Sequence, residues 1–109
     1  METQSKIKTT YTKDDLIRIV SRTIERDTNL VKSAYNALEK SVFQLLASAD
    51  KTNDISVRLF EGISLDSKFI PEKTKINNLT GKIIITSSKI KPNVNITRSY
   101  INKLTNYNN

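Results

Sequence analysis

The chain of 109 residues contains no cysteine, no histidine and no tryptophan, and it has only two glycines and two prolines. Without cysteine there is neither a disulfide framework nor thiolate chemistry, which fits a reducing compartment. Without histidine the commonest general base is missing, and two glycines are too few for a loop that cradles phosphate. We therefore expect no catalytic residues, no small-molecule substrate and no cofactor.

Clustered acids and long apolar runs are also scarce. Asp14 and Asp15 lie at an expected helix start, where capping explains them, and the other acids are scattered, so we expect no metal site. No apolar run approaches the roughly 20 residues that span a bilayer, and the polar N-terminus does not resemble a signal peptide. The expectation is a soluble intracellular protein without a membrane partner, or part of a particle assembled inside a cell.

Basic charge is present in excess and is unevenly distributed. Residues 1–54 carry nine basic and eight acidic side chains, whereas residues 55–109 carry nine basic and three acidic ones. Between Lys68 and Lys91 there are six lysines and a single acid, Glu72. A lysine-rich hairpin is often merely solvated, but the withdrawal of acids from one half of the chain favours an anionic partner.

The N-terminal half reads as a polar tail followed by two helices. Residues 1–11 are aperiodic, Thr12 is a candidate N-cap with Asp15 three residues later, and Asp27–Asn29 supplies a second cap. The apolar stripe that follows is too long for the first helix to cover, so it predicts a second copy or a related chain as partner. We expect the interface between the two chains to contain Val31, Tyr35, Leu38, Val42, Leu45 and Leu46.

The C-terminal half reads as strands and a last helix, giving the order α-α-β-β-β-α. Alternating residues predict strands over 55–59 and 63–70, joined by a turn at Glu61–Gly62. A lysine-rich arm is expected over about 68–91, with its turn at 77–81 and a returning strand over 83–90. Pro92 is expected to end the strands, and Asn93 or Asn95 to cap a helix bearing Ile96, Tyr100, Ile101 and Leu104. Residues 105–109 complete the chain as a tail.

Several motifs at matching spacings carry a family resemblance. They are Thr12–Ile17, Thr80-Gly81, Ile83–Ile85, Ser88-Lys89-Ile90, Pro92-Asn93-Val94 and Arg98. Over residues 12–104 the chain resembles the HU/IHF family of bacterial and phage histone-like DNA-binding proteins. The resemblance implies an α+β fold with a helical hairpin base, a three-stranded antiparallel sheet and a protruding β-arm. It also implies an intertwined homodimer or heterodimer, and double-stranded DNA as the partner.

The arm departs from the family pattern in ways that bear on DNA bending. Asn78 stands where the family has a proline that wedges between base pairs, and Leu79 is the adjacent apolar residue. The arm also lacks arginine, whose planar fork suits a narrow groove better than the lysine point charge. Outside the arm, Phe60-Glu61-Gly62 stands where the family has a Gly-Phe-Gly turn. The resemblance therefore implies the fold without implying a sharp bend.

Two functional hypotheses follow. The first is a nucleoid-associated, cytoplasmic architectural protein that contacts the DNA backbone and minor groove with weak sequence specificity. Its expected DNA-binding residues are Lys68, Lys73, Lys75, Asn77, Asn78, Leu79, Lys82, Lys89, Lys91 and Arg98. The second is a structural subunit of a large assembly such as a phage virion ring or tail, docking on neighbouring virion proteins with little or no DNA bending. The missing proline, the arginine-free arm and the extra tails favour the second, but the charge distribution favours DNA architecture.

Overall fold

A computed structural model describes residues 6–108 and shows an α+β protein with three helices and antiparallel strands. The chain divides into two compact units, residues 1–40 and 41–109. Residues 1–5 and 109 of the two expected tails lie outside the described residues. In chain order the elements are α1 (Lys13–Ile24), α2 (Thr28–Ala47), β1 (Ile55–Phe60), β2 (Ile63–Ile70), β3 (Lys73–Ile76), β4 (Ile83–Thr86), β5 (Lys89–Ile96) and α3 (Arg98–Asn106).

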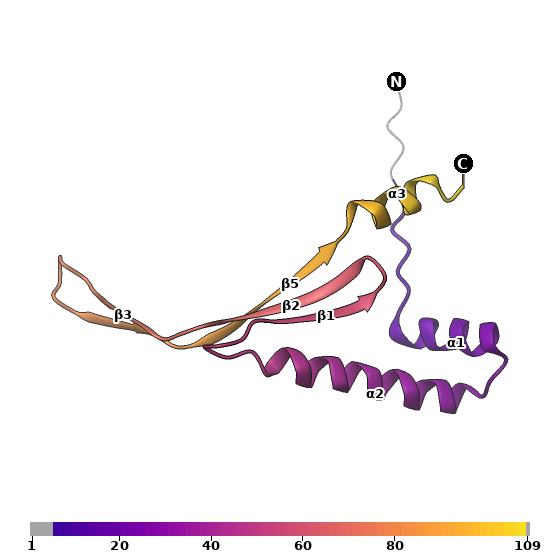
Figure 1. The fold of residues 1–109 in the computed structure, drawn as a ribbon, viewed down its shortest axis with the longest axis horizontal. Helices are drawn as coiled ribbons and strands as arrows, with labels where there is room; N and C mark the ends of the chain where they lie inside the picture. The colour runs from indigo at the N-terminus through magenta and orange to yellow at the C-terminus, as the bar shows by residue number, and fades with distance from the viewer. Residues whose placement is uncertain (1–5, 109) are drawn as a thin grey trace, which may run out of the picture. The chain divides into compact units, whose positions relative to one another are not determined.

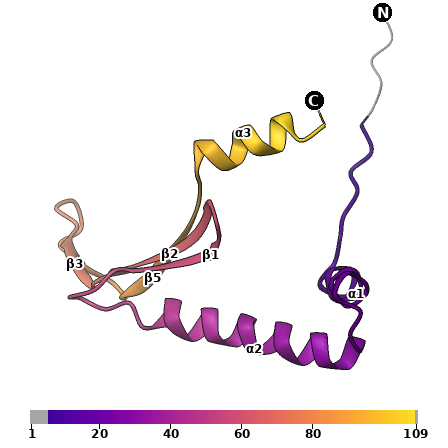
Figure 2. The same ribbon diagram turned by 45° about the vertical axis from the view of Figure 1, so that its right-hand side comes forward.

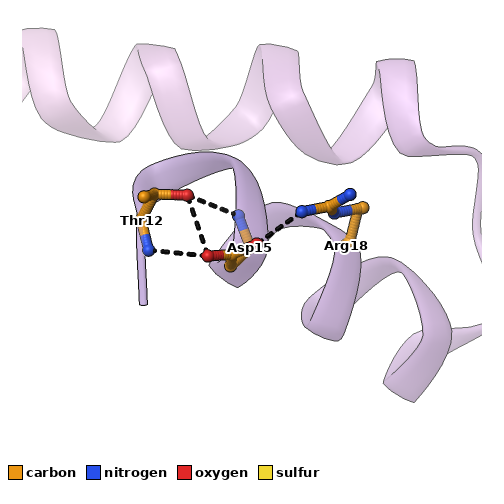
Figure 3. A network of polar contacts seen from close by, with 3 residues as sticks. All are labelled: Thr12, Asp15 and Arg18. Carbon is orange, nitrogen blue, oxygen red and sulfur yellow. Dashed lines mark hydrogen bonds and ion pairs between the residues drawn. The ribbon is translucent and has the colours of Figure 1, made fainter. Parts of the chain in front are cut away.

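The start of α1 is fixed by the predicted capping box. The backbone N–H and the hydroxyl of Thr12 donate to one carboxylate oxygen of Asp15 at 2.9 and 3.0 Å, while the Asp15 N–H donates to the Thr12 hydroxyl at 3.2 Å (Figure 3). The Arg18 guanidinium pairs with the other carboxylate oxygen. The Thr12 backbone N–H contributes most, with its hydroxyl and Arg18, to holding the pKa of Asp15 below its ordinary value.

The connection from α1 to α2 is a tight turn within the first unit. Glu25 adopts the left-handed conformation, at φ 54°, and closes the end of α1. Ser21 is buried, and its hydroxyl donates to the Arg26 carbonyl. This bond gives the buried hydroxyl a partner and ties the end of α1 to the turn. Ile17 on α1 and Val31 on α2 are the buried apolar residues described in this unit. Two helices with so few buried residues leave much apolar surface uncovered.

The second unit contains a three-stranded antiparallel sheet in the order β1-β2-β5. The burial of β1 alternates residue by residue, as the predicted alternation requires. In β2, Ser67 is 2% exposed and its hydroxyl donates to the carbonyl of Leu46, in the last turn of α2, at 2.7 Å. This bond satisfies a helix-end carbonyl and assigns the Ser67 face of the sheet to α2.

The end of the strand region was predicted incorrectly. β5 continues through Pro92 to Ile96, and Pro92 is paired with Ser67. An edge strand leaves alternate N–H groups without a strand partner, so proline at such a position costs no ladder hydrogen bond. Asn93 and Asn95 are therefore strand residues and not helix caps. The N-cap of α3 is Thr97, whose hydroxyl accepts from the Tyr100 N–H at 3.2 Å.

The β3–β4 hairpin is a separate two-stranded sheet beyond the end of the three-stranded one (Figures 1 and 2). Its returning strand was expected to be continuous over 83–90, but it is interrupted at 87–88, opposite the interruption at 71–72. Pro71 explains the outgoing break because it cannot donate to a ladder. Without that donor, the facing segment loses its pairing as well. The hairpin therefore joins the sheet through two unpaired connections.

The two expected tails differ in secondary structure: the N-terminal one has none in its described part, and the C-terminal one begins within α3. Residues 6–12 contain neither helix nor strand. At the other end, α3 extends to Asn106, two residues past the expected boundary at 104. The Thr105 hydroxyl donates to the Ile101 carbonyl at 3.0 Å within this last turn.

Asp15→Asn should make the stability of α1 less dependent on acid pH. Because the folded pKa of Asp15 is depressed, its stabilising contribution is present above the unfolded pKa, about 3.9, and is lost as pH falls through the folded pKa. The variant should melt at a lower temperature than the parent at pH 7, and the gap should narrow towards pH 3. Circular dichroism melts across this range measure the gap. Asp14→Asn, which removes the same charge from the same turn but leaves the capping box, should show a smaller effect.

Gly62→Ala should destabilise the second unit more than Gly81→Ala. Both glycines have positive φ, +100° and +71°, so an added Cβ strains either backbone. At Gly62 the new Cβ would also lie 2.8 Å from the Cβ of Tyr100, whereas at Gly81 it would meet nothing within 4 Å. We expect the loss at Gly62 to exceed the loss at Gly81 by about 1 kcal/mol or more. Urea unfolding of both variants tests this; equal losses would show that α3 does not hold this turn.

Candidate nucleic-acid interface

Apart from the irregularity between Arg58 and Phe60, the strand register assigns the residues of the three-stranded sheet to one of two faces. Directly paired residues share a face, and successive residues alternate between faces. The Ser67 face, which includes Val57, Leu65 and Phe69, is apolar and is the one tied to α2. The opposite face, called here the polar face, consists of Ser56, Arg58, Ser64, Asp66, Lys68, Ile70, Lys89, Lys91, Asn93 and Asn95.

Two predicted DNA-binding lysines are direct cross-strand partners on the polar face. Lys68 on β2 lies opposite Lys91 on β5, and Lys89 follows two residues away opposite Ile70. Like charges directly opposite each other destabilise a strand pair. No described ion pair neutralises these three lysines. The pairing costs some stability, but it concentrates positive charge on one face, and concentrated positive charge attracts anions.

The polar face is hollowed beside the lysine pair. One hollow is lined by Lys68, Lys91, Asp66 and Asn93 together with the start of β1. An adjoining hollow is lined by Arg58, Ser64, Asn95 and Thr97 along with the β1–β2 turn. The amide nitrogen of Asn95 donates to the carboxylate of Asp66. This bond fixes the orientation of Asn95, so its carbonyl oxygen is the group left to accept from a ligand.

Arg58, Asn93 and Asn95 were not predicted as DNA-binding residues. Arg58 lies in the strand expected over 55–59, and the two asparagines were expected to cap a helix. All three lie on the face that carries Lys68 and Lys91. Continuing the alternation of the last strand across Pro92 would have found the asparagines, because Lys89, Lys91, Asn93 and Asn95 occupy every second position.

The hairpin lysines lie on one face of the β3–β4 sheet. Lys73 pairs with Thr86 and Lys75 pairs with Ile84, so these four side chains share a face, called here the lysine face. Lys82 lies just before β4; its carbonyl accepts from the Asn77 N–H at 2.9 Å, and its own N–H donates to the Thr80 hydroxyl at 3.4 Å. The structure therefore brings Lys73 and Lys75 together and sets Lys82 at the hairpin tip.

The predicted groove-contacting residues form the tip. The side-chain oxygen of Asn77 accepts from the Leu79 N–H at 3.0 Å, and its carbonyl accepts from the Gly81 N–H at 2.7 Å. Asn77 thus uses its side-chain acceptor to hold the turn and keeps only the amide N–H groups for a ligand. Leu79 is 96% exposed at this tip, and Asn78 is exposed beside it.

Arg98 lies apart from the hollows of the polar face. It is the first residue of α3, and it lines a shallow surface with Asn102 and Lys103 on the same helix. The residues lining the two hollows of the polar face include Thr97 but not Arg98. Its predicted phosphate contact would therefore be made from α3, beside the sheet surface.

The described range, residues 6–108, contains neither a cluster of metal ligands nor a membrane-spanning helix. In that range no group of three or more His, Cys, Asp or Glu side chains is placed to hold a metal ion. No helix of the described part of the chain is long and apolar enough to cross a membrane.

No protein-family profile matches the chain, and no curated protein matches it. A solved structure does: HU from Anabaena in a cocrystal with DNA, which is 14% identical. The match covers 88% of this chain and 98% of that one, with a TM-score of 0.60. The chain has an HU-like fold.

The HU-like fold confirms the predicted α+β class, with its three helices and antiparallel sheet. At 14% identity the likeness concerns the path of the backbone and does not establish membership of the HU/IHF family. A shared fold does not fix a function, which depends on the residues of this chain.

Replacing Lys68 by Gln should not reduce stability at low salt, and should raise it modestly. Removing one of two opposed charges relieves a repulsion of about 0.2–1 kcal/mol, and the gain should shrink as salt screens the pair. Urea unfolding in low and high salt measures the difference. Lys51→Gln removes the same charge from an exposed loop and is the matched control. A larger loss for Lys68→Gln than for this control would assign Lys68 a structural role.

Proposed function

We propose that the chain is an architectural DNA-binding protein that contacts duplex DNA through the polar face and the basic hairpin. The observation that carries the proposal is the cross-strand pair of Lys68 and Lys91 on the hollowed face. Arg58 extends the basic surface along β1, and Lys73 and Lys75 form a second basic surface on the hairpin. A duplex follows such an extended basic surface through contacts to its phosphates. The Anabaena HU structure with the same fold was crystallised with DNA.

The working form is a dimer, either of this chain or with a related one. Of the residues predicted at the interface, Val31 is buried within the chain, while Leu38 and Leu45 are 51% and 53% exposed. Tyr35 forms part of the chain's own contacts, with the Lys13 ammonium 5.6 Å from its ring centre. Large exposed apolar residues along one helix favour burial against a partner. The dimer would display the basic surface twice.

Recognition would depend little on sequence. Lysine contacts phosphate as a hydrated point charge and does not offer the bidentate geometry with which arginine reads guanine. At the hairpin tip, the Asn77 amide and the Asn78 side chain could meet base edges in the minor groove, where the pattern of donors and acceptors is degenerate. Leu79 is the apolar group available to enter a base step there, since no proline occupies the tip.

The role is binding and not catalysis. The chain has no histidine or cysteine, and the described residues include no group of side chains placed to hold a metal. Its place would be with nucleoid DNA, or with DNA inside a virion. The HU/IHF-like domain would span residues 12–104, with the arm over about 68–91 and short tails on either side.

The salt dependence of duplex binding tests the proposal. If about six to eight charges of the dimer contact phosphate, log K should fall with log salt at a slope of about −5 to −7. Replacing both Lys68 and Lys91 by Gln in each subunit should reduce the magnitude of the slope by about 2–4. Lys51→Gln is the control and should leave the slope unchanged. Binding that is insensitive to salt would reject the proposal.

The alternative, a structural subunit of a large assembly such as a virion ring or tail, is favoured by the exposed apolar residues of the hairpin. Native mass measurement separates the two functions. A dimer that binds duplex supports DNA architecture. A closed ring of many copies formed without DNA supports the structural role.

A further inference from the structure

The β3–β4 hairpin has a second face that DNA binding does not explain. Thr74 pairs with Ile85 and Ile76 pairs with Ile83, so these four side chains share the face opposite Lys73 and Lys75. This isoleucine face contains no charged residue. Ile76, Ile83 and Ile85 are 63%, 65% and 62% exposed, so the rest of the described chain does not cover them.

An uncovered apolar face is costly for this hairpin in particular. The two strands have four residues each and form a sheet of their own. An isolated two-stranded hairpin is marginally stable in water and gains stability when a face is packed. Lysines alone would be enough to bind phosphate, so a run of isoleucines on the far side indicates a second contact.

We infer that the isoleucine face packs against the same face of a second copy of this chain while both copies are bound to DNA. The inference rests on the proposed DNA-binding function. The distribution of charge on the hairpin favours this occupant, because two isoleucine faces can meet without bringing together Lys73 and Lys75 of the two copies. Lys73 and Lys75 of each copy then point outward, on opposite sides of a four-stranded sandwich. Such a pair would hold two DNA segments, one on each lysine face.

The size of the face makes the contact dependent on DNA. Three isoleucines offer far less than the roughly 800 Å² per partner of a standard stable interface. Free copies should therefore associate weakly through it. DNA would raise the local concentration of the hairpins and neutralise their lysines, and both effects favour pairing. The expected result is cooperative binding and bridging of duplexes.

Single cysteines provide a direct test, because the natural chain has none. Thr74 and Thr86 are both on the hairpin, but Thr74 is on the isoleucine face and Thr86 is on the lysine face. Under mild oxidation on long duplex DNA, Thr74→Cys should form disulfide-linked copies at least about tenfold more than Thr86→Cys. Equal crosslinking of the two variants, or none in either, would overturn the inference.

Duplex bridging tests the function of the face. Wild-type protein on an immobilised duplex should capture a second labelled duplex, and the Ile83→Thr/Ile85→Thr variant should lose at least about 90% of that capture. Ile84→Thr is the matched control, since it lies between them in sequence but on the lysine face. It should retain capture. Circular dichroism would verify that all variants are folded.

The same variants separate this inference from the proposed function. The Ile83→Thr/Ile85→Thr variant should bind a short single duplex within about twofold of wild type. If wild type binds the short duplex but does not capture a second one, and Thr74→Cys forms no crosslinks, only the inference fails. A face that docks a different protein would give this result. If wild type does not bind the short duplex, the proposed function fails.

Discussion

The pairing of β2 with β5 is the constraint on which the rest of the second unit depends. Its register places Ser67 towards α2 and, one residue later, Lys68 towards the opposite face beside Lys91. A slip of one residue would bury lysines against the helix and expose the apolar side chains. The buried Ser67 hydroxyl, bonded to the Leu46 carbonyl, helps to hold the register because either group would be costly to leave unpaired there. The basic surface is therefore a consequence of how the sheet meets the helix.

The interruption at Pro71 has the complementary effect of separating the hairpin from that sheet. Opposite the missing donor, 87–88 also leaves the ladder, so the β3–β4 sheet begins afresh with its own pairs. Its two faces differ in character: Lys73 and Lys75 lie on one, and Ile76, Ile83 and Ile85 lie on the other. The sheet face tied to α2 is covered at Ser67 but exposed along β5, whereas both faces of the hairpin are exposed over its whole length. Charge and apolar surface are thus presented on opposite sides of the same short element.

The described chain covers little of its own apolar surface. Its buried apolar residues are Ile17, Val31 and Ala49, and residues as large as Phe43 are 72% exposed. Such a chain gains less from burial than a domain of this length usually does. Association with a second copy would supply the missing burial, and binding to DNA would offset the repulsion between lysines. Folding, assembly and DNA binding would then be linked, because each contributes stability that the isolated chain lacks.

Local chemistry in the sequence determined the helix start at Thr12, the turn at Gly62, the alternation of the strands and the bias of charge towards the second half. Apart from the charge bias, which is a matter of composition, these features depend on side chains within a few residues of one another. They can therefore be predicted from the sequence alone. The tertiary structure decided what depends on neighbours distant in sequence. Pro92 remains in a strand because β5 is at an edge, Asn93 and Asn95 join Arg58 on the polar face, and Lys68 meets Lys91. The pairing register between the strands brought these groups together. A register relates two strands, so it cannot be inferred from either strand's sequence alone.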